Sequence, residues 1–394
     1  MEQFSKVKSW LGRIEASWVW QYLLFPFITS RLVLTLVAWF TRYIGYKPGW
    51  TSYLSRGYYI SPFFWIDIWS RWDANFYLSI VKHGYVPSAD ISTQYSNLAF
   101  FPLYPYLVKL LALLLPIKAN SISTYLAVGL LLSNLCFLAA GYLLYKLIVE
   151  LFHDETIAQR TLLLLMVFPA GFFFSAFYPE SLFLLLSVAA LYAAWRKRWF
   201  LAAVLCGLAA VTRSQGSLLL IPLAWLYMDA HRWSLRAIRA DILYFLIVPA
   251  FLGAHIVSLQ AITGDWLAIL HAENAWGRFG PNAHGDLIQQ LFTINPYVAK
   301  IDIGIYLVFA ITAIYAFFKF PSKAFGAYAI AMLALPILSG NWDSLSRYLL
   351  TIFPVFIILG QASHKREIYL WLLAFFTALQ AVYFVGWLSY YFIA

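Results

Sequence analysis

The sequence predicts an all-α polytopic membrane protein, and the composition and its arrangement along the chain support this fold class. Hydrophobic residues make up 63% of the 394 residues and charged residues 11%, whereas soluble proteins average roughly 45–50% and about 25%. A water-soluble fold could not bury so much apolar surface, so most of it must face lipid or other helices within the membrane. Nearly uncharged runs also follow one another along the chain, so we expect residues 1–394 to form one integral-membrane domain.

Roughly ten or eleven runs are apolar enough and long enough to be membrane-embedded helical segments. They are about 19–44, 100–116, 122–145, 160–176, 181–195, 200–228, 242–262, 303–318, 324–340, 347–361 and 368–394. The first run follows a polar segment and has no small-residue cleavage site, so we expect a retained first span rather than a signal peptide.

Two long polar intervals, 45–98 and 263–302, mix aromatic, glycine, proline and charged residues, which predicts folded loops on the membrane surface. Clusters of lysine and arginine elsewhere should be cytoplasmic by the positive-inside rule. These clusters are Arg196–Arg198, Arg232 with Arg236 and Arg239, Lys319 with Lys323, and Lys365 with Arg366. The rule therefore places both long polar intervals on the extracytoplasmic face.

Two of the apolar runs need a different interpretation from a simple span. Both ends of 200–228 lie on the cytoplasmic side, and the polar residues Thr212–Gly216 interrupt it. We therefore expect a re-entrant hairpin of two short helices, because irregular backbone at membrane depth must line a cavity or be buried in protein. The run 100–116 is either a full span or a segment that dips into the membrane, and the sequence leaves both open.

The charge balance and the cysteines exclude several other classes of protein. Lysine and arginine exceed aspartate and glutamate by 10 charges, but the basic residues are scattered, which argues against nucleic-acid binding. We expect the excess positive charge to lie in cytoplasmic loops beside anionic headgroups and in sites that bind an anionic lipid substrate. Cys136 and Cys206 are too few for a disulfide framework or a zinc site, and the histidines show no metal-ligand spacing.

The segment 65–77 has the densest concentration of functional residue types. Its residues at helical spacing form one apolar stripe: Trp65, Trp69, Trp72 and Phe76. This pattern predicts a helix in the membrane interface, with Asp73 and Tyr77 one turn apart and the carboxylate facing a groove. The alternative, which the pattern alone favours, is an ordinary aromatic belt with a salt bridge within the helix.

The order of several motifs resembles the GPI second-mannose transferase (PIG-V) family. Arg71-Trp72-Asp73, a following tyrosine and His83-Gly84-Tyr85 resemble the first-loop signature of that family. Other resemblances are Arg31 within Thr29–Leu32, Phe100–Pro105, Phe168-Pro169 through Tyr178-Pro179-Glu180-Ser181, Thr212–Gly216, Gly264–Trp266 through Trp276-Gly277-Arg278, and Ser346-Arg347-Tyr348. Each motif is weak alone, but together they keep the family's order from about residue 25 to about residue 360.

The resemblance implies a GT-C glycosyltransferase, a multi-helix membrane enzyme with an extracytoplasmic active site. Such enzymes move a sugar, here expected to be mannose, from a polyprenyl or dolichyl phosphate to an acceptor hydroxyl on a glycolipid or glycan, with inversion. The catalytic carboxylate of the first loop falls on Asp73, with Asp67 as a second candidate. The loop lacks the Asp-x-Asp pair of the metal-binding variant, so we expect no metal and no cofactor besides the lipid-phosphate co-substrate.

Three arginines are candidates for the phosphate of the lipid donor, because the guanidinium fork matches phosphate oxygens. Arg31 lies within the first span, Arg213 at the tip of the hairpin, and Arg347 at the start of a late helix. The alternative for each is an internal ion pair, with Glu180 or Asp343 as the partner. The other expected substrate contacts are Arg71, Trp72, Tyr77, His83, Tyr85, Tyr104, Glu180 and Arg278.

Rival functions share the membrane layout. A lipid or sugar transporter should show internal repeats, and 45–98 has no counterpart in the second half. An O-antigen ligase or a protein O-mannosyltransferase would carry different first-loop motifs. The chain has no Asn-x-Ser/Thr acceptor site and is shorter than eukaryotic relatives, so we expect a bacterial or archaeal plasma-membrane protein, or an ER protein if eukaryotic. The eukaryotic relative works with a small membrane partner, which leaves an accessory subunit open here.

Overall fold

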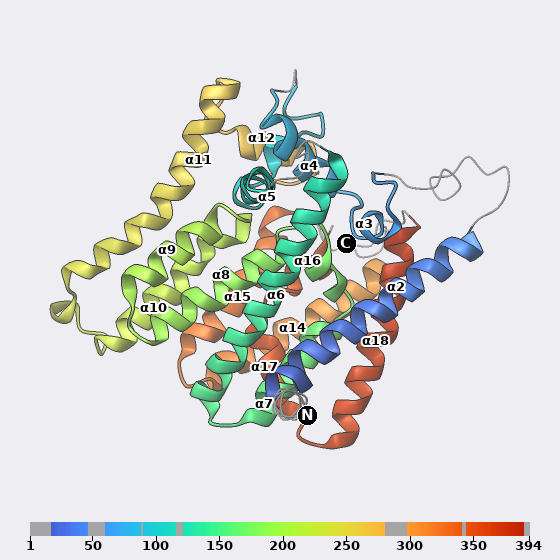
Figure 1. Ribbon diagram of the computed structural model, residues 1–394. Helices are drawn as coiled ribbons and strands as arrows, with labels where there is room; N and C mark the ends of the chain where they lie inside the picture. Colours follow the sequence, from blue (N-terminus) through green and yellow to red (C-terminus); the bar gives the residue numbers. More distant parts are fainter. Residues whose placement is uncertain are drawn as a thin grey trace, which may run out of the picture.

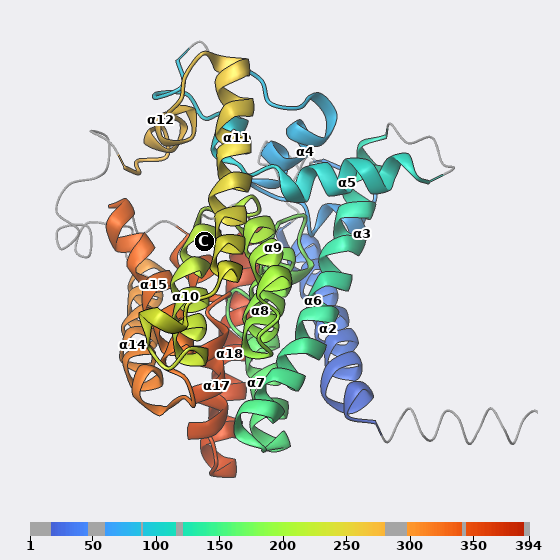
Figure 2. The ribbon, with the colours of Figure 1, turned by 90° about the vertical axis from the view of Figure 1, so that its left-hand side faces the viewer.

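The computed structural model describes residues 17–45, 60–87, 90–115, 121–279, 298–340 and 344–389. Within these ranges the regular elements are all helices, as expected. They form a bundle of membrane-type helices, and short helices cover one end of the bundle (Figures 1 and 2).

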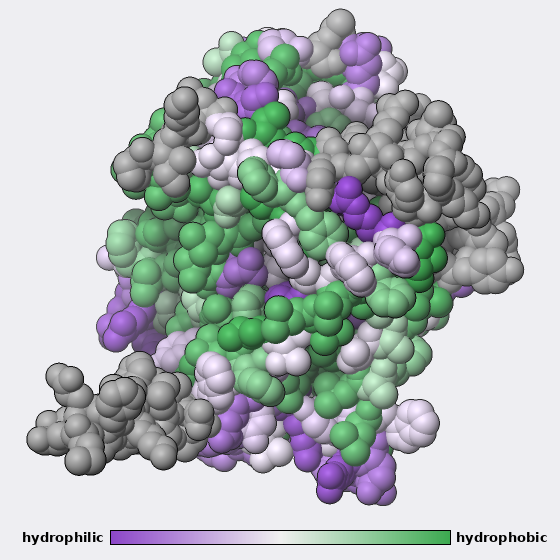
Figure 3. All heavy atoms as spheres, turned by 45° about the vertical axis from the view of Figure 1, so that its right-hand side comes forward, coloured by the Kyte–Doolittle hydropathy of each residue, from purple (hydrophilic) through white to green (hydrophobic). Residues whose placement is uncertain are grey.

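Five helices in the described ranges are long and apolar enough to cross a membrane. Three of them are single helices: α6 (Ile122–Phe152), α18 (Arg366–Leu388), and Lys300–Lys319 within α14 (Val298–Lys319). The other two each join a turn to an α-helix. Trp20–Ile44 joins the π-helical turn η1 (Trp20–Leu24) to α2 (Phe25–Gly45), and Ala240–Thr263 joins η6 (Ala240–Leu246) to α11 (Ile247–Thr263). Large apolar residues such as Leu36, Ile311 and Trp371 are exposed on these helices, and hydrophobic residues cover most of the middle of the face in Figure 3. Lipid is the environment such a surface requires, so the chain is a multi-pass membrane protein.

Shorter helices fill the interior of the bundle. They are α7 (Glu155–Val167), α8 (Glu180–Trp195), α9 (Trp199–Ala210), α10 (Leu220–Ala230), α15 (Lys323–Ser339), α16 (Leu345–Leu349) and α17 (Phe353–Ala362). Small residues let some of them pack closely, as is usual between membrane helices. At Gly326 of α15, a Cβ atom would lie 2.2 Å from the Cα atom of Phe317 in α14, so only glycine fits. Close packing of this kind holds α15 against α14.

The described parts of the two long polar intervals pack together at one end of the bundle. The first contributes α3 (Phe64–Asp67), α4 (Ala74–His83) and η2 (Asn97–Ala99), and the second contributes α12 (Ala268–Asn274). Both views place α4 and α12 at this end (Figures 1 and 2), and Trp276 joins the two intervals through ring contacts with Tyr95 and Phe76. The extracytoplasmic side of these loops stays a prediction.

The segment 100–116 forms α5 (Leu103–Leu113), an 11-residue helix. At a rise of 1.5 Å per residue this helix is about 17 Å long, and the hydrocarbon core is about 30 Å thick. Figures 1 and 2 show α5 lying across the end of α6 rather than beside it. The segment is therefore too short to span, which favours the second of the two alternatives left open by the sequence.

The prediction of one helix through 65–77 is wrong. The chain forms α3 and α4 instead, and Trp72 between them has a φ of +54° that no helix contains. Trp65 is 68% exposed and Trp69 is 8% exposed, so the tryptophans do not share one face. Tertiary hydrogen bonds override the helical pattern here, because the Tyr178 hydroxyl accepts from the Asp73 N–H and donates to the Arg71 carbonyl.

Two other predicted runs are also interrupted, each next to a proline. The run 160–176 leaves the α-helix at Val167, before Pro169, and continues as the 3₁₀ turn η3 (Gly171–Ser175). The run 347–361 divides into α16 and α17, with Pro354 in the first turn of α17. Proline lacks the N–H that a continuous helix needs, and it is well tolerated only in the first turn.

The run 200–228 forms two short helices, α9 and α10, joined through the 3₁₀ turn η4 (Ser214–Leu219). Gly216 makes this turn possible, because a Cβ atom there would lie 2.0 Å from the Ala209 carbonyl oxygen. The shape agrees with the predicted hairpin. That the hairpin enters and leaves the membrane on the same side stays a prediction.

Candidate active site

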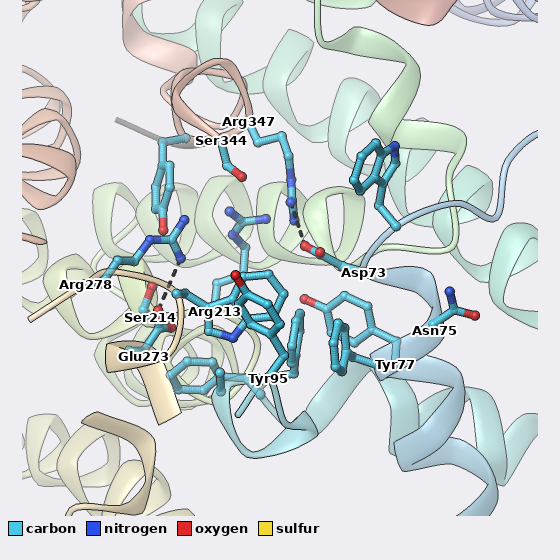
Figure 4. Close-up of a pocket in the computed structure, with 17 residues that line it drawn as sticks. Asp73, Asn75, Tyr77, Tyr95, Arg213, Ser214, Glu273, Arg278, Ser344 and Arg347 are labelled. Atoms are coloured by element: carbon cyan, nitrogen blue, oxygen red, sulfur yellow. Dashed lines mark hydrogen bonds and ion pairs between the residues drawn. The ribbon is translucent and has the colours of Figure 1, made fainter. Parts of the chain in front are cut away.

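A pocket of about 640 Å³ lies where the short helices meet the end of the bundle. It is lined from five separate parts of the chain, including α4, the tip of the hairpin, the segment after α12, and α16. The lining residues are Trp72, Asp73, Asn75, Phe76, Tyr77, Tyr95, Ala99, Phe100, Phe101, Arg213, Ser214, Glu273, Trp276, Arg278, Ser344, Arg347 and Tyr348. Figure 4 shows these side chains converging on one space.

Asp73 is the N-cap residue of α4, and its carboxylate lines the pocket. Its Oδ2 atom accepts a hydrogen bond from Arg347 Nη1 at 2.7 Å, and its side chain is 18% exposed. No residue in the described ranges donates to Oδ1. The carboxylate is therefore fixed through one oxygen and keeps the other available to a ligand.

Glu180 connects Arg347 to Arg213 behind the pocket. It is fully buried at the first turn of α8, where a carboxylate interacts favourably with the helix dipole. Its Oε1 atom accepts hydrogen bonds from Arg347 Nε at 3.0 Å and from Arg213 Nη1, and forms an ion pair with Arg347 Nη2 at 3.0 Å. With Asp73, these residues form a network of two carboxylates and two guanidinium groups whose formal charges cancel, as a buried ionic cluster requires.

Arg213 also faces the pocket. Its Nε atom donates to Gln215 Oε1 at 3.2 Å, whereas no acceptor for Nη2 is present in the described part of the chain. The guanidinium groups of Arg213 and Arg278 each lie 5.7 Å from the ring centre of Tyr348. Arg213 and Arg278 therefore flank one aromatic ring of the pocket wall.

Arg278 forms a second ion pair in the pocket, with Glu273 at 3.2 Å. Figure 4 shows the Arg278–Glu273 pair and the Arg347–Asp73 pair on opposite sides of the pocket. The available Asp73 oxygen thus lies on one side of the pocket and Arg278 on the other, and the guanidinium of Arg213 lies between them.

An aromatic wall completes the pocket, and the sequence did not single it out as part of the site. Trp276 lies 4.5 Å from the ring of Tyr95, 5.4 Å from Phe76 and 5.8 Å from Phe100, between ring centres. Glu273, which anchors Arg278, was missed as well. Trp276 stands next to Arg278 in a motif noted above, but Tyr95 and Glu273 carry no sequence signal of their own, since only the fold brings their segments together.

Asp67 and Arg71, two other candidates of the first loop, lie outside the pocket lining. They form a buried i,i+4 ion pair with a distance of 2.6 Å. Asp67 Oδ1 also accepts from the N–H groups of Ile60 and Ser61, at 2.9 and 3.3 Å. Arg71 lies beyond the end of α3, so this is not the salt bridge within a helix of the alternative interpretation; it stabilises the turn that presents Asp73.

Four further candidates also lie outside the pocket lining. Arg31 donates to the Ser175 hydroxyl at 2.6 Å and to the Gly171 carbonyl at 3.2 Å, so it ties α2 to η3 rather than pairing with a carboxylate. His83 is exposed at the end of α4. The other two are buried tyrosines whose hydroxyls donate to backbone carbonyls: Tyr85 to Phe100 and Tyr104 to Gly129. Asp343, proposed as a partner for the arginines, lies outside the described residues.

In the ranges that the model describes, no three His, Cys, Asp or Glu side chains are grouped as metal ligands. Independence from metal remains a prediction from the first-loop sequence.

The family model of the mannosyltransferases (PIG-V) matches residues 55–263, more than half of the chain. The chain belongs to this family. Among curated relatives, it is similar to GPI mannosyltransferase 2 of Yarrowia lipolytica, with 40% identity over 90 residues, 23% of this chain and 25% of that protein. It is also similar to GPI alpha-1,6-mannosyltransferase 2 of Mus musculus, with 35% identity over 150 residues, 37% of this chain and 29% of that protein. The matches thus cover less than a third of these relatives.

This PIG-V family member also resembles a solved structure, ArnT from Cupriavidus metallidurans bound to undecaprenyl phosphate. The TM-score is 0.54 over 95% of this chain and 77% of ArnT, with 13% sequence identity. At such low identity the likeness shows the fold, which is the all-helical GT-C fold expected from the sequence.

Proposed function

We propose that this protein is an inverting mannosyltransferase that uses a polyprenyl-phosphate mannose as donor and a hydroxyl of a glycolipid or glycan as acceptor. The observation that carries the proposal is the arrangement across one pocket. An aspartate with an available oxygen lines the same pocket as two arginines, with Arg278 on the opposite side and Arg213 between them. The names of the matched relatives and the polyprenyl phosphate bound to ArnT support the same reaction class.

Inversion requires the acceptor oxygen to attack the anomeric carbon from the face opposite to the phosphate. In the proposed reaction, Asp73 Oδ1 takes the proton of the acceptor hydroxyl while that oxygen bonds to the anomeric carbon. The bond between the anomeric carbon and the phosphate oxygen breaks, and polyprenyl phosphate leaves with the electron pair. Arg347 keeps the Asp73 carboxylate in position through the hydrogen bond to Oδ2.

Arg213 and Arg278 suit the leaving phosphate, because fixed guanidinium groups stabilise negative charge that develops in a poorly solvated site. Arg213 offers Nη2, for which no described residue is an acceptor, and the Gly216 turn holds it at the edge of the pocket. The membrane keeps the prenyl chain of the donor in one plane, so positioning supplies part of the rate. We place the reaction on the extracytoplasmic face, in agreement with the lysine and arginine distribution.

The test is a transfer assay with purified protein in lipid nanodiscs. Polyprenyl phosphates carrying mannose, glucose or galactose are incubated with membrane lipid and glycan extracts, and the products are analysed by mass spectrometry. We expect a mannose-dependent mass increase on a glycolipid or glycan, with polyprenyl phosphate released in equal amount. Mannose attached to a serine or threonine of a protein would favour the protein O-mannosyltransferase alternative, and no transfer from any lipid-phosphate sugar would contradict the proposal.

A further inference from the structure

Tyr77 is a pocket residue with a rigidly held ring and a hydroxyl that the fold does not use. It stands one helical turn after Asp73 in α4 and is 5% exposed. Its ring makes edge contacts with Phe100, Tyr104 and Tyr178, with centre distances of 5.0, 5.8 and 5.9 Å. Figure 4 shows its hydroxyl directed into the same space as the Asp73 carboxylate.

Three other buried tyrosines packed near α4 have internal partners for their hydroxyls. They donate to backbone carbonyls: Tyr85 to Phe100 at 2.7 Å, Tyr104 to Gly129 at 3.1 Å and Tyr178 to Arg71 at 2.9 Å. For the Tyr77 hydroxyl, no hydrogen-bond partner is present among the residues that the structure describes. The hydroxyl is not one of the fully buried unpaired atoms and its residue lines the pocket, so a molecule that enters the pocket can be its partner.

The chemistry of the hydroxyl limits what that molecule is. Burial raises the pKa of Tyr77, so the phenol stays protonated and acts as a hydrogen-bond donor. An oxygen acceptor, such as a sugar hydroxyl, is a suitable partner for this proton. The acceptor hydroxyl is assigned to Asp73 and the phosphate to Arg213 and Arg278, and inversion places the transferred sugar between these two sides.

We infer that the Tyr77 hydroxyl donates a hydrogen bond to a ring hydroxyl of the transferred sugar and so helps to select the sugar that is moved. This inference rests on the proposed function. A site built to hydrogen-bond a substrate hydroxyl rejects analogues that lack it, because a buried polar group is then left unpaired. Replacing Tyr77 with phenylalanine keeps the three ring contacts and removes only the donor.

The experiment compares wild type and Tyr77→Phe with polyprenyl-phosphate mannose and with its 2-, 3-, 4- and 6-deoxy analogues. We expect wild type to use one analogue roughly tenfold less well, measured as kcat/KM for the donor. Tyr77→Phe should lower kcat/KM for the mannose donor by a similar factor and use that one analogue as well as mannose. The KM for the glycan acceptor should not change, since the lost contact is to the donor sugar.

The control variant is Tyr306→Phe in α14, whose hydroxyl donates to the Leu333 carbonyl at 2.7 Å outside the pocket. It should melt at a lower temperature and keep wild-type selectivity among donors. Equal discrimination by wild type and Tyr77→Phe, or a change confined to the acceptor KM, would overturn the inference while leaving the proposed function intact. A wild-type protein that transfers no sugar from any of these donors would overturn the proposed function and the inference with it.

Discussion

The charged side chains around Asp73 balance one another before any substrate binds. Two carboxylates, Asp73 and Glu180, pair with two guanidinium groups, Arg213 and Arg347. Arg347 lies 2.7 Å from Asp73 and 3.0 Å from Glu180. A phosphate that enters this pocket adds negative charge and needs a donor that is not already engaged. Arg213 Nη2 meets that condition, so the proposed role as a ligand for the donor is compatible with the pairing of Arg213 and Glu180.

This dual role predicts that Arg213→Lys separates folding from binding. Lysine keeps the positive charge beside Glu180, so the variant should fold and melt near the wild-type temperature. An ammonium group lacks the planar fork, so binding of polyprenyl phosphate should weaken about tenfold or more, measured by calorimetry in nanodiscs. Wild-type affinity in Arg213→Lys, or recovery of stability and activity together in Arg213→Ala/Glu180→Ala, would show that Arg213 is only a structural partner of Glu180.

The arginines on the phosphate side also lead to a prediction about metal ions. Arg213 and Arg278 supply fixed positive charge where the leaving phosphate is proposed to bind. Transfer should therefore continue at its full rate in excess EDTA, and added Mg²⁺ or Mn²⁺ should not increase it. Loss of activity with EDTA and recovery with one of these cations would contradict this assignment of the phosphate site.

At the scale of elements, the helical segments could be predicted from the sequence much better than their interruptions. Each predicted apolar run contains a helix, because lipid requires long apolar segments with internally satisfied backbones. The break between α3 and α4 could not be predicted, since it depends on hydrogen bonds from Tyr178, more than a hundred residues away. The pairing of Glu180 with Arg213 was left as an alternative for the same reason: spacing along a chain does not reveal which segments meet in space.

The hairpin between α9 and α10 predicts a local effect of substitution at Gly216. A Cβ atom there would lie within 2.4 Å of three backbone atoms of Ala209 and Ala210, none of which can move without shifting α9. Gly216→Ala should therefore displace Arg213, lower the melting temperature and reduce transfer at least tenfold, measured by thermal unfolding and by the mannose assay.

The matched control for this substitution is Gly304→Ala in α14, where an added Cβ atom meets nothing within 4 Å. Alanine there should leave activity unchanged and slightly favour the helix. Equal melting temperatures and activities for Gly216→Ala and Gly304→Ala would show that the hairpin turn does not position the site.

At the scale of the whole molecule, the loop-covered end of the bundle and the Arg196–Arg198 turn should lie on opposite sides of the membrane. We expect single cysteines at exposed Gln94 and at partly exposed Asp265 to react with a membrane-impermeant maleimide added to intact cells. A cysteine at exposed Lys197 should react only after the membrane is opened. The native Cys136 and Cys206 are buried and provide the background control. Strong labelling at 197 in intact cells, or none at 94 and 265, would reverse the orientation.

The central claim is that Asp73 is the general base of a sugar transfer from a lipid phosphate, and its carboxamide variant tests the claim most directly. Asp73→Asn keeps the shape of the side chain and an oxygen that can accept from Arg347, but it removes the basicity. The control is Asp154→Asn. Asp154 caps a helix by accepting from the N–H groups of Thr156 and Ile157, and asparagine is an equally good helix cap.

The measurement is the turnover number for mannose transfer, made alongside polyprenyl-phosphate binding and thermal unfolding of the same samples. The account predicts that Asp73→Asn loses about a hundredfold or more in turnover while it still folds and binds polyprenyl phosphate, and that Asp154→Asn behaves as wild type. Near-normal turnover in Asp73→Asn would contradict it.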